Sequence, residues 1–268
     1  MNTIRITALF VYPVKSMAGI ALNNAELTGK GLRHDRHWMV VRKDGRFVTQ
    51  RDIPRMALVK TRLAENGVEL RLDGHGAITV PFELFHGENI ETAVWRVKCQ
   101  ATDQGDDISD WLTRALESRE RLRLVRMAPE FRRPQNKPDI MGEDTTVDFA
   151  DAAPLLVANE ASLAELNSAL ENKSLPTVPM NLFRPNIVVR GLEPFAEHEL
   201  TGLSAANFQL RLRAPCERCV VTTIDQETAE KDPAGQPFKT LQAINPIPGK
   251  PRAPAFGQYA TIIRGGSR

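Results

Sequence analysis

Short stretches of alternating or β-branched residues predominate along the chain and predict β-strands. Residues 3–11 are rich in β-branched and aromatic side chains, and residues 68–72 alternate between apolar and polar positions. Residues 38–41 and 47–49 lie on either side of Asp44-Gly45, and this arrangement predicts a hairpin. The same criteria predict further strands at residues 93–97, 121–125, 187–189, 208–213 and 220–224.

Two stretches have the spacing of amphipathic helices. Residues 107–116 carry Ile108, Trp111, Leu112 and Leu116 on one face. Asn159 is a suitable N-cap for a second helix at residues 160–170. The proline-rich residues 129–138 predict a loop or domain junction, and residues 232–254 also have the composition of a loop.

Many short strands and few helices predict a mainly β protein built from barrels or sandwiches rather than a doubly wound sheet. The two commonest nucleotide-binding fingerprints, GxGxxG and the P-loop, do not occur. We expect an N-terminal β-rich domain at residues 1–130, part of which reaches the functional site, and a second β domain at residues 131–268.

Composition limits the functions that are available to the chain. A formal net charge of +2 over 268 residues excludes the overall basic excess of a nucleic-acid-binding protein, so an anionic ligand would need a local group of cations. No run approaches the roughly 18 apolar residues of a membrane span. No secretory signal is visible, and three cysteines give no disulfide framework. We therefore expect a cytoplasmic protein without a membrane or nucleic-acid partner.

The pair Cys216-x-x-Cys219 is ambiguous when taken alone. A zinc site would need a second pair of ligands nearby, and a thioredoxin-like pair would open a helix in a βαβ unit. Two inert, partly buried thiols remain the simplest structural alternative. Arg218 could favour a thiolate electrostatically, and a thiolate is a soft ligand suited to a soft or high-valent metal.

Six stretches together resemble the MOSC family, which is named for the C-terminal domain of molybdenum cofactor sulfurase. The stretch at residues 215–225 resembles the family's hallmark around its metal-binding cysteine. The other five lie in the family's order at residues 12–16, 35–38, 159–163, 183–186 and 256–259. The resemblance is strongest to the bacterial N-hydroxylaminopurine reductases and the mitochondrial amidoxime reducing component. It implies a MOSC β-barrel packed against an N-terminal β-rich domain.

The resemblance also implies a molybdenum–molybdopterin site. It points to Cys219 as the molybdenum ligand and catalytic residue, with Cys216 as a neighbour that does not bind the metal. Glu217 and Arg218 precede the ligand and are candidate cofactor contacts, although the family often has Ser where Glu217 stands. The remaining expected cofactor-binding residues are Lys15, Ser16, Arg36, Asp151, Arg184 and Asn186.

Residue chemistry alone allows simpler readings of these positions. Lys15 could lie in an exposed turn, and Arg36 could belong to an ordinary salt bridge. Arg184 precedes Pro185 and a buried-looking strand, where an unpaired charge would be costly. A run of arginines from Arg121 to Arg133 alternates with apolar residues, and we expect it to form the solvated face of a strand.

The implied activity is the reduction of N-hydroxylated compounds, namely hydroxylamines, amidoximes and N-hydroxylated bases. The chain has no set of four cysteines for a [2Fe–2S] cluster, so we expect no C-terminal ferredoxin domain and a separate iron–sulfur or flavin protein as electron donor. We also expect a barrel without the last strand that relatives usually have. The alternatives are a non-redox sulfur or cofactor carrier with a persulfide on Cys219, and a thiol-bearing scaffold.

Overall fold

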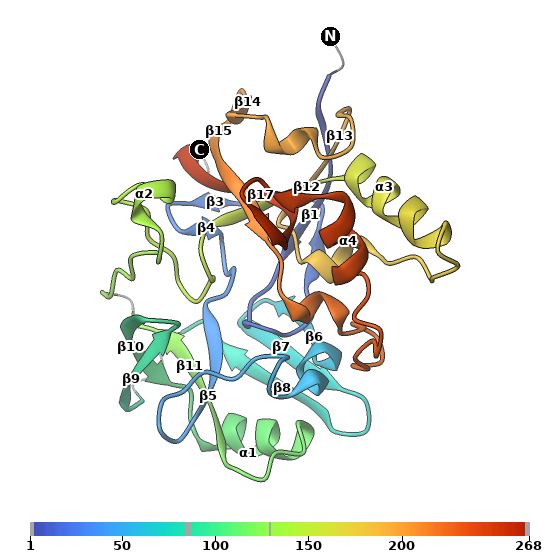
Figure 1. Ribbon diagram of the computed structural model, residues 1–268. Helices are drawn as coiled ribbons and strands as arrows, with labels where there is room; N and C mark the ends of the chain where they lie inside the picture. Colours follow the sequence, from blue (N-terminus) through green and yellow to red (C-terminus); the bar gives the residue numbers. More distant parts are fainter. Residues whose placement is uncertain (1–2, 84–86, 129, 266–268) are drawn as a thin grey trace.

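Two β-rich lobes make up the molecule in a computed structural model that describes residues 3–83, 87–128 and 130–265 (Figure 1). We call residues 38–127 the lower lobe, after its position in Figure 1. The upper lobe combines residues 5–32 with residues 138–264.

Two antiparallel sheets, one α-helix and one 3-10 helix form the described part of the lower lobe. The larger sheet has the strand order β5 (Trp38–Arg42), β11 (Leu122–Met127), β10 (Val97–Asp103) and β9 (Asn89–Val94). The smaller sheet has the order β6 (Lys60–Ala64), β7 (Gly67–Leu72) and β8 (Gly76–Pro81). The α1 helix (Asp106–Ala115) and the 3-10 helix η1 (Pro54–Leu58) complete the lobe.

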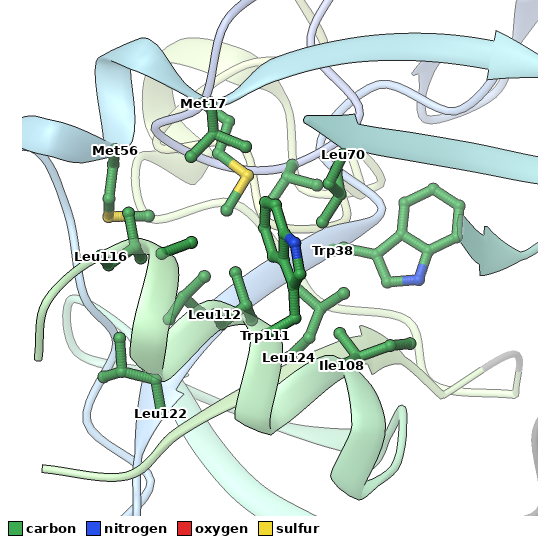
Figure 2. Packing of buried hydrophobic residues seen from close by; sticks show 14 of the residues in the cluster. Met17, Trp38, Met56, Leu70, Ile108, Trp111, Leu112, Leu116, Leu122 and Leu124 are labelled. Atoms are coloured by element: carbon green, nitrogen blue, oxygen red, sulfur yellow. The ribbon is translucent and has the colours of Figure 1, made fainter. Parts of the chain in front are cut away.

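Helix α1 encloses the lower core. Its apolar face carries Ile108, Trp111 and Leu112, which belong to the same buried cluster as Leu122 and Leu124 of β11 (Figure 2). The same core contains Met17 from the loop after β1 and Met56 from η1 (Figure 2). The loop around Met17 is thereby fixed against the lower lobe.

One large sheet dominates the upper lobe. Its order is β14 (Gly202–Ala205), β15 (Phe208–Glu217), β17 (Lys250–Arg264), β12 (Leu155–Asn159), β13 (Ile187–Arg190), β1 (Arg5–Val11) and β2 (Ile20–Leu22). Only the β12–β13 pair is parallel among these neighbours. The short strand β16 (Pro246–Ile247) pairs with β17, and β3 (Leu27–Thr28) pairs with β4 (Gly31–Leu32).

Short helices flank this sheet. They are α2 (Pro138–Met141), α3 (Glu160–Glu171), α4 (Phe238–Ile244), and the 3-10 helices η2 (Met180–Phe183), η3 (Ala196–His198) and η4 (Val220–Thr223). The fold class predicted from the sequence, mainly β with a few helices, is confirmed. The predicted cap is also present, because the Asn159 side chain accepts a hydrogen bond from the amide of Ala161 at 3.1 Å.

Three local predictions were wrong. The strand predicted at residues 93–97 is broken by a turn at residues 95–96 between β9 and β10, with Val94 opposite Val97 and Trp95 at a φ of 56°. A tight turn of this kind usually contains Asn or Gly, so Trp95-Arg96 gave no turn signal. Residues 220–223 form η4 instead of a strand, because the hydroxyls of Thr222 and Thr223 bond back to the carbonyls of Cys219 and Val220. The expected loop at 232–254 contains α4 and β16.

Strand β1 belongs to the predicted N-terminal domain but pairs with β13 of the predicted C-terminal domain. The strand lies between β13 and β2, so residues from the N-terminal part complete the sheet of the upper lobe. The domain boundary at residues 130 and 131 stays a prediction.

Among the described residues, none of the helices combines the length and the apolar character that a membrane span requires.

We predict that Leu112→Ala lowers the free energy of unfolding by about 2–5 kcal/mol, because Leu112 is fully buried and truncation leaves a cavity under α1. Ile140→Ala is the matched control, since this side chain is 42% exposed, and it should change stability by less than about 0.5 kcal/mol. Urea unfolding measures both values. Equal losses in the two variants would contradict the assignment of the core.

Candidate functional site

A cavity of about 140 Å³ lies where the two lobes meet. It brings together all the site residues expected from the sequence except Glu217. These lining residues are Lys15, Ser16, Arg36, Asp151, Arg184, Asn186, Arg218 and Cys219. Five separate segments of the chain therefore contribute to one site.

Lys15 is held inside the protein by its neighbours in the chain. Val14 and Met17 are fully buried in the lower core, and the Lys15 amide donates to the carbonyl of Trp38 at 2.8 Å. The Lys15 Nζ atom lies 2.6 Å from Asp151 Oδ1 and donates to the carbonyl of Phe149 at 2.9 Å. Lys15 is only 6% exposed, so the alternative that it lies in an exposed turn is excluded.

The two partners of the Lys15–Asp151 ion pair differ in burial, and the pKa of each is lowered for a different reason. Burial lowers the pKa of Lys15, and the carboxylate of Asp151 opposes this change. Desolvation would raise the pKa of Asp151, but the charge and hydrogen bond of Lys15 outweigh it and lower the pKa to about 2. The side chain of Asp151 is 54% exposed, so it remains an ionised acceptor at the edge of the cavity.

Arg36 and Arg184 supply two guanidinium groups to the same wall. Arg36 Nη1 lies 2.5 Å from the carboxylate of Asp35, and Arg36 Nη2 donates to the carbonyl of Arg184 at 3.2 Å. Arg184 Nη1 donates to the carbonyl of Met17 at 2.7 Å. Burial, followed by the charge of Arg36, lowers the pKa of Arg184 to about 10.

Three of the cavity residues have left-handed backbones. The φ angles are 68° at Ser16, 50° at Arg36 and 55° at Arg184. Positive φ is uncommon for residues other than glycine, and such strain tends to gather at functional sites. Nine non-glycine residues in the described part of the chain have positive φ, and three of them line this cavity.

The two cysteines have different surroundings. Cys216 is 4% exposed, and Arg218 Nη1 lies 2.9 Å from its sulfur. Cys219 is partly exposed at the start of η4, and Arg51 Nη2 lies 2.9 Å from its sulfur. The sequence had suggested Arg218 as the cation that favours a thiolate. In the structure that cation contacts Cys216, and Arg51 from the other lobe contacts Cys219.

Glu217 lies outside the cavity, contrary to its expected place among the cofactor contacts. Successive side chains of a strand point to opposite faces, so Cys216 faces inward and Glu217 outward at the end of β15. Its carboxylate is exposed and lies 3.5 Å from Lys250 Nζ.

Asn186 lines the cavity but also holds the sheet together. Its side-chain oxygen accepts from the amide of Leu156 at 3.1 Å, and its side-chain nitrogen donates to the carbonyl of Phe10 at 3.2 Å. These bonds tie β12 and β1 to β13 beside the site.

Two residues at the edge of the site gave no signal in the sequence. Arg51 has its guanidinium carbon 5.1 Å from the ring centre of Trp95, within cation–π distance. The Trp95 indole donates to Asp151 Oδ1 at 2.9 Å. Neither residue belongs to a recognisable motif, and only the folded turn between β9 and β10 carries Trp95 to the cavity.

Arg133 was expected on a solvated surface, and the structure corrects this. Its side chain is completely buried and donates to the carbonyls of Asp148, at 2.6 Å, and Ala150. Arg133 thereby shapes the segment that carries Asp151. The partners are backbone carbonyls, which no side-chain pattern in the sequence reveals.

The chain therefore consists of two β-rich lobes that meet at a basic cavity with a partly exposed thiol. Known domain families match both parts of it. Residues 3–119 match the MOSC N-terminal beta barrel domain, and residues 144–267 match the MOSC domain. The chain belongs to the MOSC family.

Several curated relatives match almost the whole chain. The mitochondrial amidoxime-reducing component 1 of Danio rerio is 35% identical over 97% of this chain and 81% of its own length. The mitochondrial amidoxime reducing component 2 of Bos taurus is 31% identical over 98% of this chain and 80% of its own length. Component 1 of Homo sapiens is also 31% identical, over the same shares of the two chains.

We predict that Asp151→Asn lowers the free energy of unfolding at pH 6 by about 1 kcal/mol, because it leaves the buried Lys15 without a carboxylate. The pKa of Asp151 is lowered in the folded protein, so its contribution is present above the usual value of 3.8 and is lost as the pH falls toward about 2. Urea unfolding at a series of pH values measures the difference between wild type and variant.

Glu91→Gln provides the control, since Glu91 pairs with Lys98 on an exposed surface. It should change stability by less than about 0.5 kcal/mol at every pH. A difference between Asp151→Asn and wild type that does not shrink on acidification would contradict the ion pair.

Proposed function

We propose that this protein is a molybdenum-cofactor-dependent oxidoreductase that reduces N-hydroxylated compounds. The observation that carries the proposal is the gathering of Cys219 with Lys15, Arg36, Arg184 and Arg218 around one cavity. The relatives named as amidoxime-reducing components support N-hydroxylated compounds as the substrate class. Within this class we propose hydroxylamines, amidoximes and N-hydroxylated bases.

The donors in the cavity fit a phosphorylated pterin that carries molybdenum. Guanidinium and ammonium groups are the charge-assisted donors that a phosphate needs. The sulfur of Cys219 is a soft ligand, suited to a high-valent metal bound through sulfur. Arg218 lines the cavity, and its buried Nε has no hydrogen-bond partner within the described residues, so it can bind an acceptor on a ligand.

The cavity must enlarge to hold a cofactor of this size. A volume of about 140 Å³ is below the roughly 300–1,000 Å³ of most ligand pockets. One wall is the exposed side chain of Arg51, which can rotate away from Cys219 at little cost. We propose that Arg51 moves in this way when the site is filled.

Each residue then has a separate task. In this proposal Cys219 binds the metal, while Lys15, Ser16, Arg36, Arg184 and Arg218 bind and orient the pterin and its phosphate. When bound, the cofactor supplies the two-electron chemistry that removes oxygen from an N-hydroxylated nitrogen. Asp151 is ionised and held by Lys15 and Trp95, so it acts as an acceptor that fixes these two side chains and does not donate a proton.

The electron donor in this proposal is a separate iron–sulfur or flavin protein. The chain has three cysteines, and two of them, Cys99 and Cys216, are buried. They cannot supply the four ligands of a plant-type cluster. A cytoplasmic location stays a prediction from the sequence.

A second candidate function is a non-redox carrier of sulfur or molybdenum cofactor. It is favoured by the partial exposure of Cys219 and by the guanidinium of Arg51 beside its sulfur, which suit a reactive thiol or persulfide. Metal analysis of freshly purified protein separates the two. Stoichiometric molybdenum, together with reduction of a benzamidoxime by an artificial electron donor, supports the reductase. A persulfide on Cys219 without molybdenum supports the carrier.

We predict that Cys219→Ser abolishes activity and molybdenum retention while the thermal midpoint stays close to that of wild type, because a partly exposed thiol contributes little to packing. Cys216→Ser should retain molybdenum and most of the activity. Metal analysis, circular dichroism and amidoxime reduction measure these effects. Equal loss of activity in both variants would indicate a dithiol mechanism instead.

Glu217→Gln is the matched control in the same segment. Its side chain points away from the cavity toward Lys250, so molybdenum content and activity should equal those of wild type. Loss of molybdenum in this variant would contradict the outward position of Glu217.

A further inference from the structure

Tyr12 lies at the end of β1, where its ring contacts both arginines of the basic wall. The side chain is 1% exposed. The guanidinium carbons of Arg36 and Arg184 each lie 4.3 Å from the centre of its ring. Both distances are well inside the roughly 6 Å over which an aromatic face attracts a cation.

The two guanidinium groups need such a partner because they repel each other. The charge of Arg36 contributes to the lowered pKa of Arg184. Asp35 is the carboxylate that directly contacts Arg36, and Arg184 Nη1 bonds to a backbone carbonyl that carries no net charge. An aromatic ring that attracts both cations offsets part of this repulsion.

The hydroxyl of Tyr12 has no role in this arrangement. It is buried and has no hydrogen-bond partner among the described residues. Burial raises the pKa of Tyr12 to about 12, against the charges of Arg184 and Arg36, so the phenol is neutral at physiological pH. The ring therefore attracts the arginines through its π face and not through a phenolate charge.

We propose that Tyr12 is a positioning residue, whose aromatic ring holds the Arg36 and Arg184 guanidinium groups near each other so that both can bind one phosphate group. The inference rests on the proposed function, in which this wall holds the phosphate of the cofactor. Two planar guanidinium forks brought together match a dianionic phosphate better than one. Without the ring, the two cations separate and the shared site is lost.

The backbone of Tyr12 supports the same arrangement and is unaffected by substitution of the side chain. Its amide donates to Asp35 Oδ1 at 2.9 Å, and its carbonyl accepts from the amide of Arg36 at 2.8 Å. Variants at position 12 therefore test the ring itself.

The experiment measures binding of inorganic phosphate to the full chain, purified without cofactor, by isothermal titration calorimetry. We expect Tyr12→Phe to bind phosphate within about twofold of wild type, because the ring face remains. We expect Tyr12→Leu to bind at least about fivefold more weakly, because both cation–π contacts are lost. Unchanged affinity in Tyr12→Leu, or equal weakening in Tyr12→Phe, would overturn the inference.

Two arginine variants show whether the phosphate binds at this site. Arg184→Gln should abolish the binding. Arg211→Gln, at an exposed position of β15, should leave it unchanged. Phosphate binding that is absent in wild type, or that survives in Arg184→Gln, overturns the inference.

A third replacement keeps the test valid if Tyr12→Leu does not fold. Trifluorophenylalanine at position 12 preserves the shape of the ring but withdraws electron density from its face. We expect its phosphate affinity to be about threefold or more below that of Tyr12→Phe, since the cation–π attraction weakens while packing stays the same. Equal affinities would assign Tyr12 a packing role only.

Molybdenum analysis of the same variants keeps the two proposals apart. If wild-type protein lacks molybdenum but binds phosphate in a manner that depends on the ring, the proposed function fails and the role of Tyr12 stands. If molybdenum is present and Tyr12→Leu binds phosphate like wild type, the role of Tyr12 fails and the proposed function stands.

Discussion

The structure around the site depends on one requirement: several buried cations at the junction of the two lobes must each have a partner. Removing a charge from water is costly unless it is paired or hydrogen-bonded. In the part of the chain that the structure describes, the acidic partners that contact this group directly are Asp35 and Asp151. Backbone carbonyls supply much of the remaining compensation, through the contacts of Lys15 with Phe149, Arg184 with Met17 and Arg218 with Phe183. Both lobes must therefore be in place before the charges can be enclosed.

This constraint explains the irregular backbone around the cavity. Carbonyl groups can face a buried cation only where they are free of sheet pairing. The loops at Ser16 and Arg184, which have left-handed φ angles, meet this need with the carbonyls of Met17, Phe183 and Arg184. Residues held in such conformations persist when the surrounding structure determines them. Here Met17 in the lower core and Asn186 in the upper sheet fix the chain on either side. Packing far from the cavity thus sets the positions of the charged groups.

The sequence was most informative where local patterns decide the structure. The periodicity of α1 and the N-cap at Asn159 identified both long helices. Ordered motifs pointed to eight residues that line the cavity, and also to Glu217, which lies outside it. It was least informative where tertiary contacts decide. Trp95 occupies a tight turn without glycine or asparagine, and Val220 to Thr223 coil because threonine hydroxyls bond backwards. Arg51 and Arg133 reach their partners only in the folded chain, so neither had a local signature.

The placement of β1 has a consequence for how the chain folds. The strand pairs with β13, and the Thr7 hydroxyl donates to the carbonyl of Val188, 181 positions further along the chain. Contacts between such distant segments carry a large loop-closure entropy, which slows folding in proteins of high contact order. A fragment that began after the lower lobe would expose the edge of β13 and lack both Lys15 and Arg36. During synthesis β1 is made before β13, so it can pair with that strand only after the whole lower lobe has been made.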